Sequence, residues 1–259
     1  MLSLQRNIMS YVPSSSGVVL LDPLAITGIR QFLTPETFNS STKKRWDDAS
    51  AVKASYYTNS YNGTITDTIN GYTVPKFEGY NGSYPHNSEY LMGNGAYIFS
   101  TTSFTWIAVL KPTANGAYMS PQAVQGDSNN RLLRFGITAN KFTLDLRDSA
   151  GITLNVTSDS VITDGWNIVA CTMNGATKVA NIYLKGITNT GTFTGTPFAS
   201  NLNGADMIGG GSYNATPSWL YDGSIASIAN YTTVLTKAQI DGVCSTLANK
   251  FDLKWLSIQ

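Results

Sequence analysis

The chain has 259 residues, of which 13% are charged, and its formal net charge is +1. A net charge this close to zero gives no electrostatic basis for binding nucleic acid, and an aromatic content of 11% is not that of a disordered chain. No apolar stretch is long enough for a membrane-spanning helix, and the N-terminus lacks the cationic head and apolar run of a secretion signal. We therefore expect a protein that is made in a cytosol and does not insert into a membrane.

The N-terminal residues are expected to be separate from the rest of the chain. The run Pro-Ser-Ser-Ser-Gly at 13–17 divides an arm, residues 1–17, from a single domain that spans residues 18–259. The arm either docks on another subunit or chain, or is loosely held.

Residues 18–100 are rich in tyrosine and glycine and have weak periodicity. Short strands are predicted at 18–21, 73–77 and 97–99, and one helical turn within 22–38. The second half of the chain gives clearer patterns.

Alternating apolar residues form several short runs after residue 100. Phe104, Trp106 and Ala108 share one face of a predicted strand, whereas Ile107 and Val109 share the other, so this strand should be buried on both faces. Further strands are predicted at 131–137, 142–147, 152–156 and 224–231, with a Thr/Gly-rich connection at 191–203.

The stretch from 166 to 184 is the strongest hairpin signal in the chain. Apolar residues alternate on both sides of the short segment Asn174-Gly175-Ala176-Thr177. Period-two alternation around an Asn-Gly turn is typical of an antiparallel hairpin, which we expect at the centre of a sheet.

One helix is predicted near the C-terminus. Thr236 and Gln239 have the spacing of a capping box, and Leu235 and Ile240 that of a hydrophobic staple. Apolar residues recur at helical spacing on one face, namely Ile240, Val243, Cys244, Leu247 and Phe251. Many short strands with turn signals and a single short helix predict an all-β fold in which two antiparallel sheets form a β-sandwich.

The chain has two cysteines, Cys171 in a predicted strand and Cys244 on the apolar face of the predicted helix. Two cysteines in a chain of this length do not make a disulfide framework, so buried free thiols are the preferred interpretation. A single bridge between them is the alternative.

Five segments occur in an order that resembles a known superfamily. They are FTWIAVLKP, GWNIVACTMNG, NIYLKG, MIGGG and YDGSIASIANYTTVLTKAQI. In this order they resemble the concanavalin A-like lectin/laminin-G superfamily over roughly residues 18–251, and the segments at 46–50 and 75–79 resemble its phage-borne members. The resemblance implies a concanavalin A-like jelly roll. It does not decide the function, because the superfamily includes lectins, adhesion modules, glycoside hydrolases and virion proteins.

The residues argue against catalysis. Glycosidases use a pair of carboxylates, but the chain has only three glutamates, Glu36, Glu78 and Glu89, and the Glu-x-Asp-x-x-Glu type of motif is missing. The sole histidine, His86, lies in a turn-rich segment. We predict a non-catalytic protein; a glycosidase or lyase is the less favoured alternative and would need Glu78 and Glu89 brought together.

The sequence offers one candidate for a metal site. One histidine and two separated cysteines exclude a conventional zinc site. The best calcium candidate is Asp127 in the polar segment at 127–130, with Asp206 or Asp222 as a partner from elsewhere. The spacing matches no dedicated calcium loop, so we predict ordinary polar loops and no cofactor.

Tyr213, Asn214 and Trp219 form the best candidate for a glycan site. Lectin sites combine an aromatic platform with hydrogen-bonding groups on a loop, and these three residues lie together between the triple glycine and the last strand. A place for Tyr213 and Trp219 in the core is an equal alternative, whereas Tyr221 is expected in the core.

We predict a structural or decorating protein of a bacteriophage particle. An Asn/Thr/Ser/Gly-rich sandwich with an N-terminal arm and no secretion signal resembles such virion proteins, which form homo-oligomers and contact other virion proteins. A host-surface adhesin that binds cell-surface glycans is the alternative. The two differ because an adhesin leaves an aromatic-rimmed groove open, whereas a decorating protein buries apolar surface against its neighbours.

Overall fold

The computed structural model describes residues 18–58, 65–78, 90–93, 102–113, 119–125, 132–148, 150–162, 165–196, 206–213, 216–218 and 220–258. The predicted arm at 1–17 and the predicted strand at 97–99 lie outside these residues. Within the described ranges, no helix is both long and apolar enough to cross a membrane.

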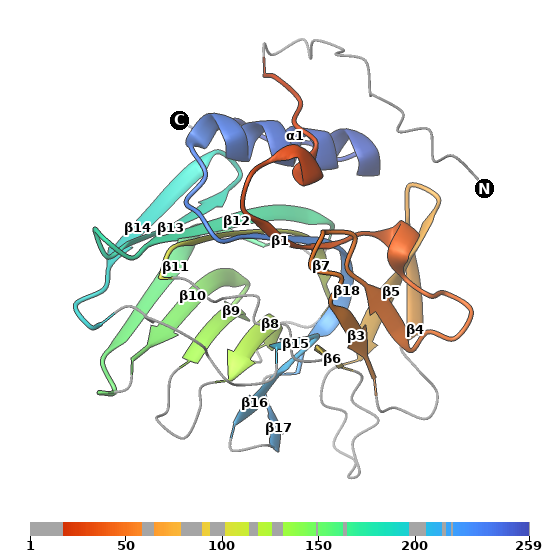
Figure 1. The fold of residues 1–259 in the computed structure, drawn as a ribbon, viewed down its shortest axis with the longest axis horizontal. Helices are drawn as coiled ribbons and strands as arrows, with labels where there is room; N and C mark the ends of the chain where they lie inside the picture. Colours follow the sequence, from red (N-terminus) through yellow and green to blue (C-terminus); the bar gives the residue numbers. More distant parts are fainter. Residues whose placement is uncertain are drawn as a thin grey trace.

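Two antiparallel sheets of eight strands each form a sandwich (Figure 1), which confirms the predicted fold class. Sheet A contains β1 (Ile29–Leu33), β4 (Ile65–Ile69), β5 (Tyr72–Glu78), β7 (Phe104–Pro112), β12 (Asn167–Asn174), β13 (Val179–Leu184), β14 (Ile187–Thr192) and β18 (Asp222–Tyr231). Its order is β14-β13-β12-β7-β18-β5-β4, and β1 also pairs with β18.

Sheet B contains β2 (Arg45–Asp47), β3 (Ser55–Tyr57), β6 (Leu91–Gly93), β8 (Met119–Gln125), β9 (Leu132–Thr138), β10 (Lys141–Arg147), β11 (Thr153–Val161) and β15 (Asp206–Ile208). Its order is β11-β10-β9-β8-β15-β6-β3-β2, so the β2–β3 pair lies at one edge. A separate hairpin joins β16 (Gly211–Tyr213) to β17 (Thr216–Ser218).

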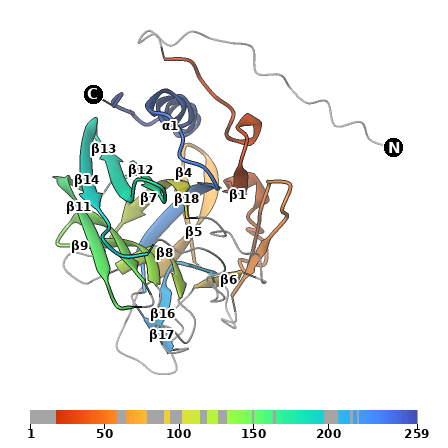
Figure 2. The same cartoon turned by 60° about the vertical axis from the view of Figure 1, so that its left-hand side comes forward.

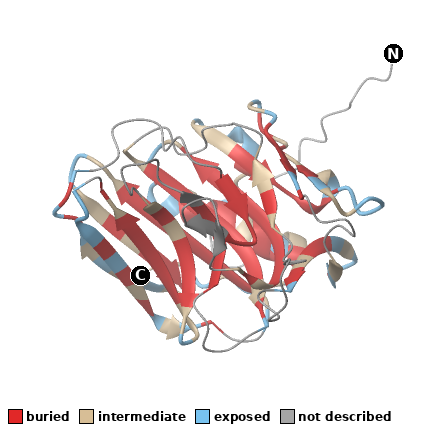
Figure 3. Ribbon diagram, turned by 90° about the horizontal axis from the view of Figure 1, so that it is seen from below, coloured by how far each residue is buried: buried red, intermediate tan, exposed pale blue. Residues whose placement is uncertain are grey.

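Sheet A is buried on both faces because sheet B covers one face and the helix α1 (Lys237–Phe251) packs on the other (Figures 1 and 2). Trp106 and Leu110 of β7 belong to the cluster between the sheets, whereas Ile107 and Val109 belong to the cluster beneath the helix. This arrangement explains why β7 is apolar on both faces. Seen from the side opposite α1, buried residues run along the centres of the strands (Figure 3).

The predicted hairpin at 166–184 is confirmed by the pairing of β12 with β13, in which Ala170 lies opposite Tyr183. The Asn174 side chain closes the turn by accepting hydrogen bonds from the backbone nitrogens of Ala176 (3.0 Å) and Thr177 (3.1 Å). The next strand, β14, was not predicted, because its sequence ITNTGT has no apolar alternation.

The predicted start of the helix is also confirmed. The Thr236 hydroxyl accepts from the Gln239 backbone nitrogen at 3.2 Å, and the Thr236 nitrogen donates to Gln239 Oε1 at 2.9 Å. Leu235 and Ile240 are both buried. The apolar face of the helix therefore seals the outer side of sheet A.

The two cysteines are buried and free, as preferred from the sequence. Cys171 lies in the cluster between the sheets and Cys244 in the cluster beneath α1, so sheet A separates them. Burial raises the pKa of both thiols well above the ordinary value.

One prediction for the first part of the domain is wrong and another is incomplete. Residues 18–21 are not a strand; they lie along α1, where the Leu21 nitrogen donates to the Gly242 carbonyl at 3.3 Å. The segment 22–38 contains β1 between two short 3-10 turns, η1 (Pro23–Ala25) and η2 (Pro35–Thr37), rather than one helical turn. Proline at the first position of each turn fixes its backbone.

Candidate functional site

The predicted glycan site lies largely outside the described residues. The backbone of Tyr213 ends β16 and pairs with Thr216, whereas Asn214 and Trp219 lie outside the described residues. The role of these three side chains therefore stays a prediction. Tyr221, which was expected in the core, is fully buried.

The weak calcium prediction gains no support. Asp127 lies outside the described residues, Asp206 points into the sandwich, and Asp222 accepts a hydrogen bond from Thr113. Across the ranges that the structure describes, no three His, Cys, Asp or Glu side chains gather where they could hold a metal ion.

The outward face of the β2–β3 pair carries a polar surface that sequence reasoning missed. Because side chains alternate along a strand, Trp46 and Tyr56 point into the core, and their neighbours Arg45, Asp47 and Tyr57 point outward. From sequence alone, Lys43-Lys44-Arg45 reads as a solvated loop. The alternation of apolar and polar residues in RWD is the signal that could have placed Arg45 on a strand.

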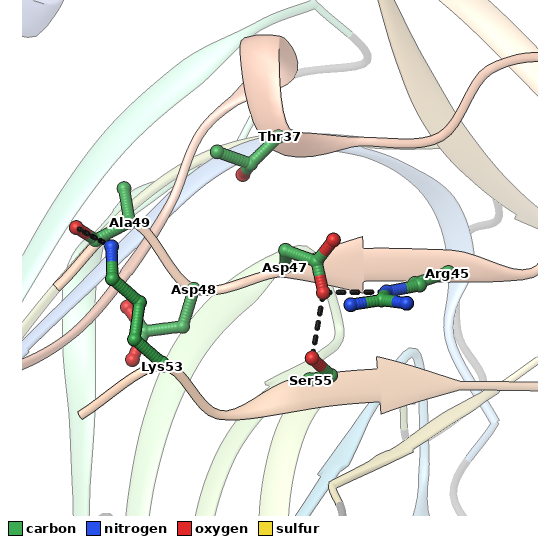
Figure 4. Close-up of a pocket in the computed structure, with 7 residues that line it drawn as sticks. All are labelled: Thr37, Arg45, Asp47, Asp48, Ala49, Lys53 and Ser55. Atoms are coloured by element: carbon green, nitrogen blue, oxygen red, sulfur yellow. Dashed lines mark hydrogen bonds and ion pairs between the residues drawn. The ribbon is translucent and has the colours of Figure 1, made fainter. Parts of the chain in front are cut away.

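A pocket of about 400 Å³ opens on this face (Figure 4). Its lining residues come from η2, from β2 and β3, and from the turn between those strands: Thr37, Arg45, Asp47, Asp48, Ala49, Lys53 and Ser55. Asp47 Oδ1 accepts from Arg45 Nε and from Ser55 Oγ, both at 2.6 Å. The hydrogen bond to Asp47 raises the pKa of Arg45, so the guanidinium stays charged.

Tyr57 extends this surface beyond the pocket. Among the described residues, Tyr57 is the only exposed aromatic residue, at 38% exposure. Tyr57 lies opposite Arg45 in the β2–β3 ladder, and the guanidinium carbon of Arg45 lies 5.4 Å from the ring centroid. A flat ring thus stands beside charged and hydroxyl groups on one surface.

The inner wall of the pocket is fixed by Asp48, which is 2% exposed. Its Oδ1 accepts from the backbone nitrogens of Phe32 and Ser50, both at 2.7 Å, and its Oδ2 accepts from Ser50 Oγ at 2.6 Å. The Asp48 carboxylate therefore holds the chain at the end of β2 against β1.

The opposite wall is tied to the helix. Thr37 donates through its hydroxyl to the Thr34 carbonyl at 3.0 Å, and Lys250 of α1 donates to Thr34 Oγ1 at 2.7 Å and to Glu36 at 2.8 Å. Burial raises the pKa of Glu36, but hydrogen bonds from Lys250 and Thr34 outweigh it and bring this pKa below the usual value. The pocket thus has walls that are held in place before any ligand arrives.

A second set of polar residues lies inside the sandwich, directly behind this surface. We call it the inner cluster; it consists of Gln31, Tyr56, Trp106, Gln122, Asp206 and Asn230, all buried. Tyr56 donates to Asp206, and Gln122 Nε2 donates to Asp206 Oδ1 at 2.9 Å, while Trp106 Nε1 donates to Gln122 at 2.6 Å. Burial raises the pKa of Asp206 to about 6, against the effect of these hydrogen bonds.

A carboxyl with a raised pKa is what a glycosidase uses as its acid. Asp206, however, is 5% exposed and points into the sandwich, away from both outer faces. A sugar cannot reach it without separating the sheets. The inner cluster therefore serves the structure of the sandwich.

Comparisons with known proteins agree with this fold. The model of the concanavalin A-like lectin/glucanases superfamily matches residues 85–241, which is more than half of the chain. No curated protein sequence matches the chain.

Solved structures with a similar fold include the binding domain of Paraclostridial Mosquitocidal Protein 1, at 12% identity and a TM-score of 0.61 over 86% of this chain and 53% of that one. The CBM40 of the Ruminococcus gnavus IT-sialidase bound to alpha2,6 sialyllactose has 21% identity and a TM-score of 0.51, with 70% and 96% of the two chains covered. The K499G mutant of the NanB sialidase from Streptococcus pneumoniae has 14% identity and a TM-score of 0.54, over 65% of this chain and 27% of that one.

At these identities the likeness concerns the fold alone, and the chain spans about a quarter of the length of the NanB sialidase chains. The family match and the two-sheet sandwich together establish the family. The chain belongs to the concanavalin A-like lectin/glucanases superfamily.

Proposed function

We propose that this protein is a non-catalytic glycan-binding protein and that it binds sugar on the outward face of the β2–β3 pair. The observation that carries the proposal is the exposed ring of Tyr57 beside Arg45, Asp47 and Ser55. Sugar sites combine an apolar ring, against which the C–H face of a sugar packs, with a few polar groups that fix its hydroxyls. The lectin-like fold and the CBM40 relative with bound sialyllactose support this choice.

The carboxylates support a binding rather than a catalytic role. At the candidate site, Asp47 accepts hydrogen bonds from Arg45 and Ser55, and Asp48 from Phe32 and Ser50, so both carboxylates help to hold the walls of the pocket. Of the pair considered for a hydrolase, Glu78 is exposed at the end of β5 and Glu89 lies outside the described residues.

The test is binding of the purified protein to a panel of bacterial polysaccharides and host glycans, with Tyr57→Ala and Trp219→Ala as separate variants. Loss of binding in Tyr57→Ala but not in Trp219→Ala is the expected result. The reverse result would move the site to the loop around residues 213–219. Ile187→Ala, which truncates an exposed side chain on β14, is the control. No binding to any glycan would contradict the proposal.

The place of the protein on a bacteriophage particle remains a proposal that comes from the sequence. It is supported by the low charged fraction of 13% and by a composition rich in Asn, Ser, Thr and Gly. Under this proposal the protein is a homo-oligomer held to other virion proteins through residues 1–17. Mass spectrometry of purified particles and light scattering of the full chain against a chain without residues 1–17 test the two parts separately.

A further inference from the structure

The β2–β3 site offers a ligand the donors of two cations, Arg45 and Lys53, most of which the protein does not use. We infer that its ligand is an acidic saccharide, whose carboxylate or sulfate group binds at Arg45 and Lys53. This inference rests on the proposed glycan-binding function and names the chemical class of the ligand.

Three of the four carboxylate oxygens of the site already accept hydrogen bonds from the protein. Asp47 Oδ1 accepts two hydrogen bonds, from Arg45 and Ser55. Asp48 accepts three from Phe32 and Ser50, and it is buried. Asp48 is therefore committed to holding the wall of the pocket, whereas Asp47 uses one of its two oxygens and keeps Oδ2 for a ligand hydroxyl.

The donors are less committed. A guanidinium has five N–H groups and an ammonium three, by their chemistry. Within the described part of the chain, Arg45 donates one hydrogen bond, through Nε to Asp47, and Lys53 donates one, to the Ala49 carbonyl at 3.2 Å. Figure 4 shows the two side chains on opposite sides of the pocket, with Asp47 and Asp48 between them, so each cation can bind a different group of an extended ligand. An acceptor-rich anion is the ligand that matches such a set.

The charge of the surrounding segment points the same way. Residues 37–58 contain four cationic and two acidic side chains, so their formal charge is +2. The whole chain has a net charge of +1, so the other residues together carry −1. The cationic residues are Lys43, Lys44, Arg45 and Lys53. Lys44 and Arg45 are placed at the edge of the sheet by hydrogen bonds from the Thr58 and Asn39 nitrogens to their carbonyls, at 3.1 and 2.9 Å. Two of these four cations, Arg45 and Lys53, line the pocket.

The neighbouring ring explains why the ligand is a saccharide rather than a small inorganic anion. A pocket of about 400 Å³ lies within the usual size range of sites for small organic ligands. The Arg45 guanidinium lies over the Tyr57 ring, and 38% of Tyr57 is exposed, so a sugar ring can pack on the exposed part of the ring while its acidic group meets Arg45.

The experiment uses two matched pairs of polysaccharides as probes. Polygalacturonate is compared with its carboxyl-reduced form, and dextran sulfate with dextran, by biolayer interferometry on the full chain. The variants are Arg45→Gln, Lys53→Met and Tyr57→Ala, and Lys254→Met removes one exposed charge elsewhere as the matched control. Thermal unfolding confirms that each variant is folded.

Binding of one or both acidic probes, at least about tenfold tighter than their neutral partners, is expected. Arg45→Gln and Lys53→Met should each weaken it by about tenfold, and Lys254→Met should not. Binding that differs between the carboxylate and the sulfate probe identifies the acidic group.

Equal binding of acidic and neutral probes, lost only in Tyr57→Ala, would overturn the acidic class and leave the glycan-binding function intact. Equal weakening by Lys53→Met and Lys254→Met would also overturn it, because that result indicates attraction to net charge rather than to this site. Failure of all four probes and of the whole glycan panel would reject both the function and the ligand class.

Discussion

Tyr56 and Tyr57 are neighbours on β3, yet they belong to opposite environments. Tyr56 is fully buried and donates to Asp206 in the inner cluster, whereas Tyr57 is 38% exposed and lies against Arg45. The two faces of one short strand thus carry the same side chain for different purposes. The side chains of the inner cluster are hydrogen-bonded to one another, with Asn230 Oδ1 as an exception, because an unpaired polar atom is costly there, whereas those outside keep donors that a ligand can use.

The inner cluster joins the two sheets. Gln31 and Asn230 come from sheet A and Tyr56, Gln122 and Asp206 from sheet B; Gln31 donates to Tyr56, and Asn230 donates to Gln31. Directional hydrogen bonds across the interior favour one register of the sheets over others, which apolar packing alone does less well. The inner cluster should therefore control stability and leave ligand binding largely unchanged.

The largest expected effect is the contrast between Tyr56→Ala and Tyr57→Ala. Removing the buried ring should lower the free energy of unfolding by about 3–5 kcal/mol, because it leaves a cavity and strips Asp206 of a donor. Removing the exposed ring should cost less than about 1 kcal/mol. Urea denaturation of both variants measures the difference.

Tyr56→Phe separates the two contributions in the core. It keeps the ring and removes the hydroxyl, so it should cost about 1–3 kcal/mol. Equal losses of stability in Tyr56→Ala and Tyr57→Ala would show that the two faces do not differ as described.

The second test uses pH. The pKa of Asp206 is about 6 in the folded chain, above the unfolded value of 3.8, so the folded state holds this proton more tightly. The stability from this group is fully present below the unfolded pKa and is lost as the pH rises through about 6. The free energy of unfolding of the wild type, minus that of Asp206→Asn, should rise by up to about 3 kcal/mol from pH 7 to pH 4.

Subtracting the variant is necessary because other carboxylates act in the opposite direction. Glu36 has a lowered pKa in the folded chain, so its contribution is lost on acidification, but equally in both proteins. A difference curve that is flat, or that falls toward pH 4, would contradict the protonation of a buried Asp206.

Two serine–aspartate hydrogen bonds give a third test with a smaller effect. Ser50 Oγ to Asp48 and Ser55 Oγ to Asp47 are both 2.6 Å long, but the Asp48 side is buried, whereas the Asp47 side chain is 39% exposed. Ser50→Ala should cost about 1.5–3 kcal/mol, because a buried charged group loses a donor. Ser55→Ala should cost less than about 1 kcal/mol, because water replaces the hydroxyl. Thermal unfolding at one pH compares the two, and equal costs would refute the contrast.

The elements that the sequence predicted well have strong periodic patterns. The hairpin of β12 and β13, the doubly buried β7 and the capped helix all have patterns that local physics sets, and these were confirmed. Strands such as β1 and β14 were missed because their partners, β18 and β13, determine them more than their own residues do.

The candidate site was harder to predict for a related reason. Arg45, Lys53 and Tyr57 lie in a part of the chain with weak periodicity, and their common surface exists only once β2 and β3 pair at the edge of sheet B. The inner cluster joins Gln31 to Asp206, which lie far apart in the sequence and meet through Gln122 and Tyr56. No local sequence pattern indicates such a contact between residues that are far apart in the chain.

Arg45→Lys should have the smallest effect on stability and yet be informative. The Arg45–Asp47 pair is exposed, with 47% and 39% of the two side chains accessible, so exchanging one cation for another should leave the free energy of unfolding nearly unchanged. Arg45→Lys keeps the charge, but an ammonium cannot reproduce the planar fork of a guanidinium. The affinity of this variant for polygalacturonate or dextran sulfate should therefore fall. Arg45→Gln removes both the charge and the planar fork. The difference in affinity between Arg45→Lys and Arg45→Gln therefore separates the effect of charge from that of geometry. If Arg45→Lys destabilised the chain as much as Ser50→Ala does, Arg45 would be a structural residue and the outer face would differ from the inner one only in exposure. If affinity alone falls, the outward groups of β2 and β3 act on the ligand, and the fold depends on the residues that point the other way.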